Sequence, residues 1–102
     1  LLAWSIENII RNGIDSIVQK DGIITVSLRK ELDDIKIRIT DNGKGIPKKD
    51  WRNIFRPGFS TKQTGWGLGL SLAKRIIEDI HDGDLRIIKS SGIKGTIFEI
   101  NL

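Results

Sequence analysis

The chain has 102 residues, with 17 Lys or Arg against 13 Asp or Glu and a net charge of +4. This length allows one domain with a modest two-layer core and excludes two domains. The absence of cysteine excludes disulfides and thiolate zinc sites, and no apolar run approaches the roughly 20 residues that span a bilayer. Because the sequence opens in helix without Met, we expect residues 1–102 to be an N-terminally truncated domain of a larger protein. We expect this domain to be cytoplasmic and to make no membrane contact, whether or not the whole protein is membrane-anchored.

The first predicted element is a long amphipathic helix over residues 2–19. Its predicted buried face recurs at helical spacing and comprises Ile6, Ile10, Ile14 and Ile17. The opposite side carries a polar stripe of Asn8, Asn12, Asp15 and Gln19. The turn residues at 20–22 end the helix.

A hairpin follows the first helix. Residues 23–29 and 34–40 alternate β-branched and polar side chains, which predicts two strands joined by residues 30–33. Asp41-Asn42-Gly43 breaks the second strand, and residues 47–53 begin with Pro at a position suited to the first turn of a short helix.

The second half begins with an aperiodic stretch, residues 54–66, for which we expect a mobile loop. A second helix is predicted over residues 67–81, with a buried stripe of Leu72, Ala73, Ile76, Ile77 and Ile80. Residues 85–89 and 96–102 read as two further strands joined by a turn at 90–92. This order lacks strict βαβ alternation, so we expect an α+β fold: a two-layer α/β sandwich whose sheet is mixed or largely antiparallel, with the helices on one face.

Three groups of residues suggest chemistry, and the first is the pair Asn8 and Asn12. Residues four apart lie on one face of a helix, where two amide oxygens can bind a hard cation such as Mg²⁺. The alternative is two solvated asparagines. Asn is uncommon in helix interiors, which favours a function for the pair.

The second group follows the second strand, in Asp41-Asn42-Gly43-Lys44-Gly45-Ile46-Pro47. A carboxylate at a strand end can accept a hydrogen bond from the exocyclic amine of adenine. Gly43 and Gly45 would let the backbone approach a flat ring because they have no Cβ. An ordinary turn would explain Asp-Asn-Gly alone.

The third group is Gly65-Trp66-Gly67-Leu68-Gly69-Leu70, which opens the second predicted helix. Glycine-rich backbone at a helix N-terminus presents free N–H groups to phosphate. The motif is neither a dinucleotide fingerprint nor a Walker A loop. Lys62 lies just before it, within reach of polyphosphate oxygens.

Taken together, these motifs resemble the catalytic domain of sensor histidine kinases, in the superfamily shared with Hsp90, type II topoisomerases and MutL. Residues 6–17 resemble the N box, 41–47 the G1 box, 54–62 the F box and lid, and 65–77 the G2 box. Gly95-Thr96-Ile97-Phe98 is similar to the final glycine motif. The resemblance runs from about residue 4 to the end of the chain.

The resemblance implies Mg-ATP as the ligand. It implies that Asn12 is the main Mg²⁺ ligand with Asn8 as its partner, and that Asp41 binds the adenine amine with Thr96 nearby. The base pocket would include Gly43, Gly45 and Ile46, and the phosphates would lie against Lys62, Gly65, Gly67, Leu68 and Gly69. Asn8 and Asn12 are therefore the predicted catalytic pair.

Three features depart from the family pattern. Asp15 stands where a basic residue often contacts phosphate, so that role would pass to Arg11 or Lys62. Ser16 stands where an aromatic residue often packs on the base. The strand that usually precedes the N box is missing, which leaves a free sheet edge.

The function implied is transfer of the γ-phosphoryl group of ATP to a histidine on a separate dimerisation domain, with a response regulator downstream. The isolated domain would bind ATP and do little chemistry. The alternatives are an ATP-driven clamp, an anti-sigma-factor serine kinase and an inactive nucleotide-binding module. Clamp ATPases use a carboxylate four residues before the Mg-binding Asn, where this chain has Asn8. His81 is read as a helix-end residue, and the three Trp are read as packing residues, so no nucleic acid partner is expected.

Overall fold

The computed structural model describes residues 1–59 and 69–102. The helices are α1 (Leu2–Ser16) and α2 (Gly69–Arg75), and α2 continues as a π-helical turn, η3 (Ile76–Ile80). Two 3-10 turns, η1 (Lys48–Asp50) and η2 (Asn53–Phe55), follow the first hairpin. The strands are β1 (Ile24–Glu31), β2 (Asp34–Asp41), β3 (Asp84–Ser91) and β4 (Gly95–Asn101).

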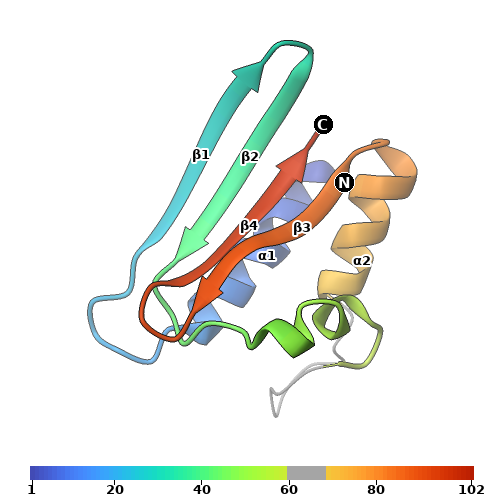
Figure 1. Ribbon diagram of the computed structural model, residues 1–102. Coiled ribbons are helices and arrows are strands. Elements are labelled where there is room, and N and C mark those ends of the chain that lie inside the picture. The colour runs from blue at the N-terminus through green and yellow to red at the C-terminus, as the bar shows by residue number, and fades with distance from the viewer. Residues whose placement is uncertain (60–68) are drawn as a thin grey trace.

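The four strands form one sheet in the order β1-β2-β4-β3, and every pairing is antiparallel. Both helices lie on the same face of this sheet, as Figure 1 shows. The predicted two-layer sandwich is therefore confirmed, and of the two sheet types expected the antiparallel one is found among the described strands. The reason is local: two hairpins joined through β2 and β4 need no parallel crossover.

The core lies between the sheet and the helices. Alternate residues of the two central strands face the helices, notably Ile39 of β2 and Phe98 of β4, which are paired across the sheet. Ile9 of α1 and Ile77 at the start of η3 meet them from the other layer, and both are fully buried. Residues on the other pleat, such as Arg38, lie on the open face.

The predicted buried stripe of α1 is partly wrong. Ile14 is 55% exposed, whereas the fully buried row is Ser5, Ile9 and Gly13. Ile6 and Ile10 are only partly buried at the margin of this row. The buried face of α1 is therefore offset from the predicted one and includes two small residues. Small side chains let the helix approach the sheet and α2 closely.

The predicted stripe of the second helix is also only partly correct. Ala73 and Ile77 are fully buried, but Leu72 is 40% and Ile80 59% exposed. The π-helical turn that begins at Ile76 explains the second discrepancy, because its wider turns move later side chains off the α-helical stripe.

The stretch expected to be an irregular loop is structured in its described part. Residues 53–55 form η2, and Ile54 is buried in the core. The remainder of the predicted loop, residues 60–66, lies outside the described residues. Across the described part of the chain, no helix has both the length and the apolar character needed to cross a bilayer.

Candidate nucleotide-binding site

Helix α1 places Asn8 beside the start of α2. The Asn8 amide nitrogen donates a hydrogen bond of 2.9 Å to the Trp4 carbonyl oxygen one turn earlier, which leaves the amide oxygen as the outward group. A Cβ built on Gly69 would lie 2.8 Å from that oxygen. Any larger residue at position 69 would displace the Asn8 side chain, so α1 and α2 meet at this point, as expected for the two predicted phosphate-end motifs.

Asn12 lies one turn beyond Asn8 on the same side of α1. It is half-buried, and within residues 1–59 and 69–102 its side chain has no hydrogen-bond partner. Its amide oxygen is therefore available to a ligand. The two asparagines lie beside the buried row of α1, and not on the opposite side of the helix as predicted. This position explains why both are half-buried.

Asp41 ends β2 and is only 3% exposed. Its Oδ1 atom accepts two hydrogen bonds, from the Gly43 N–H at 2.9 Å and the Thr96 N–H at 3.3 Å, and the Ser16 hydroxyl lies 3.3 Å away but closer to the Gly13 carbonyl oxygen, at 2.7 Å. Such donors offset the cost of burying a carboxylate. No described residue donates to Oδ2, which lies beneath Gly13. One carboxylate oxygen is thus held in place while the other remains an open acceptor.

The two glycines of the turn after β2 lie in close contact with other segments of the chain. A Cβ on Gly43 would collide with the Ser16 hydroxyl, and the neighbouring Lys44 N–H donates to the Ser16 carbonyl at 3.0 Å. Gly45 has φ +76°, and a Cβ there would collide with the Ser91 carbonyl oxygen. Both glycines therefore have a packing reason in addition to the predicted approach to a base.

Thr96 forms the floor of the site together with Asp41. It is 2% exposed, and its hydroxyl lies 2.7 Å from the Ser90 hydroxyl. Ser90 in turn accepts the Ile46 N–H at 2.6 Å. Sequence reasoning missed Ser90, and it noted Ser16 only as a departure from the family pattern without expecting its contact with Asp41. The available signal was weak: a serine that the β3–β4 hairpin sets opposite a predicted site residue.

Four of the predicted phosphate-binding residues lie outside the described residues: Lys62, Gly65, Gly67 and Leu68. Among those that the structure describes, Arg11 and Asp15 are both exposed on α1. Most of the predicted site residues that are described fall into two groups. Asn8 and Gly69 make one end, Asp41, Gly43, Gly45, Ile46 and Thr96 make the other, and Asn12 lies on α1 between the positions that contact them.

The sequence matches a family profile over residues 2–102, that of the histidine kinase-, DNA gyrase B- and HSP90-like ATPases. The chain belongs to this ATPase family. Binding of ATP is accordingly the property that the two groups of site residues have to explain.

Individual relatives of this ATPase domain are sensor and sporulation kinases. The chain is 40% identical to sporulation kinase C of Bacillus subtilis over 95 residues, which are 93% of this chain and 22% of that protein. The structure of the mycobacterial sensor histidine kinase MprB is similar with a TM-score of 0.84 and 27% identity, over 97% of this chain and 67% of that one. A complex of the histidine kinase ThkA with the response regulator TrrA is similar at a TM-score of 0.78 and 26% identity, over 96% of this chain and 27% of that one. The chain spans about a fifth of the length of the curated relative.

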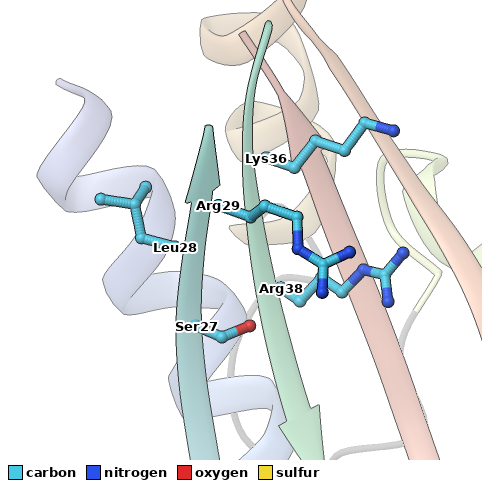
Figure 2. Close-up of a pocket in the computed structure, with 5 residues that line it drawn as sticks. All are labelled: Ser27, Leu28, Arg29, Lys36 and Arg38. Atoms are coloured by element: carbon cyan, nitrogen blue, oxygen red, sulfur yellow. The ribbon is translucent and has the colours of Figure 1, made fainter. Parts of the chain in front are cut away.

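A hollow of the ATPase domain lies on the open face of the sheet, away from the helices. It measures about 190 Å³ and is lined by Ser27, Leu28, Arg29, Lys36 and Arg38 (Figure 2). Its cations are already paired: Arg29 and Lys36 with Glu31, and Arg38 with Glu99. The hydrogen bond from Lys36, followed by that from Arg29, lowers the pKa of Glu31. This hollow therefore offers less to an anion than its composition suggests.

Proposed function

We propose that this chain is the ATP-binding catalytic domain of a sensor histidine kinase and that it acts on a histidine outside itself. In the reaction, a bond forms between the histidine nitrogen and the γ-phosphorus of ATP, the bond to the β–γ bridging oxygen breaks, and ADP leaves. Most of the catalysis in such transfers comes from positioning and charge stabilisation. The domain's contribution is to hold the nucleotide in one orientation.

The observation that carries this proposal is that α1 contacts both groups of site residues. Asn8 lies against Gly69 at one end, and Ser16 lies against Asp41 at the other. These two positions on α1 are about 12 Å apart along the helix axis, on the scale of a nucleoside triphosphate. The base would lie at the Asp41 end and the phosphates at the Gly69 end.

The base end fits adenine through the free Oδ2 of Asp41. Because Oδ1 is occupied by two backbone donors and approached by the Ser16 hydroxyl, Oδ2 is the acceptor left for the exocyclic amine. Thr96 lies beside it, and Gly43, Gly45 and Ile46 form the turn that closes this end. Within the chain these residues bind and orient the base.

The phosphate end fits Mg²⁺ held jointly by the chain and the nucleotide. No cluster of three or more acidic or His side chains able to hold a metal exists within the described residues, so phosphate oxygens would have to complete the coordination. Asn12 and Asn8 would supply the protein ligands, a set that suits a hard cation. A bound Mg²⁺ would neutralise charge on the phosphates. Lys62, Gly65, Gly67, Leu68 and Gly69 would complete this end.

Transfer is favoured over hydrolysis by the side chains of α1. Glu7, the nearest carboxylate before Asn12, is exposed, and Asn8 occupies the position facing Gly69. The chain therefore presents an amide where a water-activating carboxylate would have to stand. His81 does not serve as the acceptor in this proposal: it ends η3, about 18 Å along the helix from Gly69.

The proposed partners are a histidine-bearing dimerisation domain of the same protein and a response regulator. The kinase ThkA forms a complex with the response regulator TrrA. Sporulation kinase C of Bacillus subtilis is several times longer than this chain. Both facts support a larger protein that passes phosphate onward. We place the domain in the cytoplasm, where ATP is available.

The test begins with titration of Mg-ATP into the protein, followed by addition of a histidine-bearing dimerisation domain and radiolabelled ATP. We expect phosphate on protein that is acid-labile and base-stable. Asn12→Ala should abolish Mg-dependent transfer with an unchanged circular dichroism spectrum. Glu7→Gln on the same helix is the matched control and should leave transfer intact.

Three outcomes contradict the proposal. Absence of ATP binding up to millimolar concentration removes the nucleotide site altogether. Acid-stable phosphoserine favours the anti-sigma-factor alternative. ATP hydrolysis that is lost in Glu7→Gln favours the clamp ATPases, because it would make Glu7 the base.

A further inference from the structure

A chain of three hydrogen-bonding groups lies beside Asp41. The Ile46 N–H donates to the Ser90 hydroxyl at 2.6 Å, and the Ser90 and Thr96 hydroxyl oxygens are 2.7 Å apart. Thr96 also donates its backbone N–H to Oδ1 of Asp41. The hydroxyl of Thr96 is therefore tied to the same floor as the carboxylate that the nucleotide site depends on.

We propose that Ser90 is a positioning and specificity-determining residue: its hydroxyl orients the Thr96 hydroxyl as a donor to a ring nitrogen of adenine. This inference rests on the nucleotide site proposed above and assigns a role to a residue that lies outside its motifs. Ser90 itself does not touch the nucleotide. It acts through Thr96.

One hydrogen bond joins the Ser90 and Thr96 hydroxyls, and it uses the proton of only one of them. The Ile46 N–H already donates to Ser90 and cannot accept the other proton. Among the described residues no other group accepts from either hydroxyl. One of the two hydroxyl protons is therefore always left without an acceptor. When Ser90 donates to Thr96, that proton belongs to Thr96, in the buried floor beside Asp41.

The position of that proton matches the edge of adenine. Adenine presents an amine donor at position 6 and an acceptor at the neighbouring ring nitrogen N1. Oδ2 of Asp41 accepts from the amine, and the Thr96 proton fits the nitrogen. Guanine presents the opposite pattern, an oxygen and an N–H, so it would set its oxygen against the carboxylate. A mismatch of this kind is what excludes a competing ligand.

The strand register explains why Ser90 can do this. Ser90 pairs with Thr96 across the β3–β4 hairpin, and directly opposite side chains of an antiparallel pair lie on the same face. A bulge between Ile87 and Lys89 shifts the register just before this pair. Two residues that are six apart in sequence are thereby brought together on the helix-facing side of the sheet.

The experiment measures the affinity of the full-length protein carrying this chain for three nucleotides, with and without Ser90→Ala. The probes are Mg-ATP, its analogue with CH in place of N1, and its analogue lacking the 6-amine. In the wild type we expect the N1 analogue to bind about tenfold more weakly than ATP, as loss of one good hydrogen bond implies. In Ser90→Ala we expect that penalty to fall below about twofold, while the penalty for the missing amine stays unchanged.

Equal weakening of all three nucleotides would overturn the proposal, because Ser90 would then act only through the general shape of the site. An unchanged N1 penalty would overturn it too.

The matched control is Ser27→Ala, which changes an exposed serine on the open face of the sheet and should alter no affinity. If Ser90→Ala folds poorly, Ser90→Cys serves instead, since a thiol is a weak donor and should reduce the N1 penalty in the same way. Failure of the wild type to bind ATP at all would instead defeat the proposed function, so the two failures are distinguishable.

Discussion

The two faces of the sheet leave their polar groups in different states. On the helix-covered face, Asp41 keeps one oxygen open and Asn8 turns its amide oxygen toward Gly69. On the open face, Glu99 is 2% exposed and is held between Arg38 at 2.9 Å and Arg86 at 3.5 Å. The first face keeps hydrogen-bonding groups open, and the second has charges that neutralise one another.

This contrast shows that charge alone does not mark a binding site. The hollow on the open face has three basic residues, Arg29, Lys36 and Arg38 (Figure 2). Each of them is nevertheless paired with a carboxylate of the chain. The helix-covered face has fewer charges but has open hydrogen-bonding capacity in rigid positions. A ligand gains most where buried polar groups have no other partner.

The largest expected effect tests the open acceptor directly. Asp41→Asn keeps an oxygen for the Gly43 and Thr96 N–H groups but can place an NH₂ where Oδ2 faced the adenine amine. We expect ATP affinity to fall about 100-fold or more, equivalent to about 3 kcal/mol, with the fold retained. Calorimetric titration checks the affinity, and an affinity within threefold of wild type would remove Asp41 from its proposed role.

The matching change on the open face should lower the stability of the fold and leave the affinity for ATP unchanged. Glu99→Gln leaves two guanidinium groups without their carboxylate, which we expect to lower the free energy of unfolding by about 2 kcal/mol, discounted because both arginines are partly exposed. ATP affinity should remain unchanged. Chemical denaturation together with nucleotide titration measures both, and a selective loss of affinity would erase the distinction between the faces.

A smaller effect is expected where α1 meets α2. Gly69→Ala would place a Cβ 2.8 Å from the Asn8 amide oxygen, so Asn8 must move. We expect Mg-ATP affinity to fall about tenfold, as for loss of one interaction with a charged ligand. Gly92→Ala is the matched glycine control, because its added Cβ would have only an ordinary contact of 3.7 Å with the Lys44 carbonyl. Equal behaviour of the two variants would argue against the contact.

Ser16→Ala should have a weaker effect. Its hydroxyl donates to Asp41 at 3.3 Å but also lies 2.7 Å from the Gly13 carbonyl oxygen. Since Oδ1 of Asp41 keeps two other donors, we expect ATP affinity to change by less than about threefold. A large loss would show that Ser16, and not the backbone of the turn, holds the carboxylate.

The smallest effect concerns the ion pair between Lys74 and Glu78, which belongs to neither the candidate site nor the charged cluster on the open face. Burial raises the pKa of Glu78, but the hydrogen bond and charge of Lys74 outweigh burial and lower it from 4.5. A folded-state pKa below the unfolded value means that the pair stabilises the fold above about pH 4.5 and loses this contribution as the pH falls further. Glu78→Gln should therefore cost less than about 1 kcal/mol at pH 7 and progressively less toward pH 3. Urea denaturation at both pH values checks the sign, and a cost that grows in acid would contradict it.

The sequence by itself predicted the order of helices and strands and proposed a set of site residues. Period-two alternation marked both hairpins, and Asp41 lies at a strand end as expected, although β3 continues to Ser91 through residues predicted as a turn. The same local signals indicated helices at the N-terminal end and after the glycine motif. These features depend on neighbours in sequence, which is why periodicity and turn chemistry were sufficient.

Only the tertiary structure decided which atoms are open and what orients them. The rotation of α1 toward Ser5 and Gly13 was invisible in its hydrophobic pattern because small residues contribute little to it. The partner of Thr96 depended on the β3–β4 register, and the free oxygen of Asp41 depended on donors from three separate segments. Such arrangements follow from contacts between distant parts of the chain, so no local pattern could have specified them.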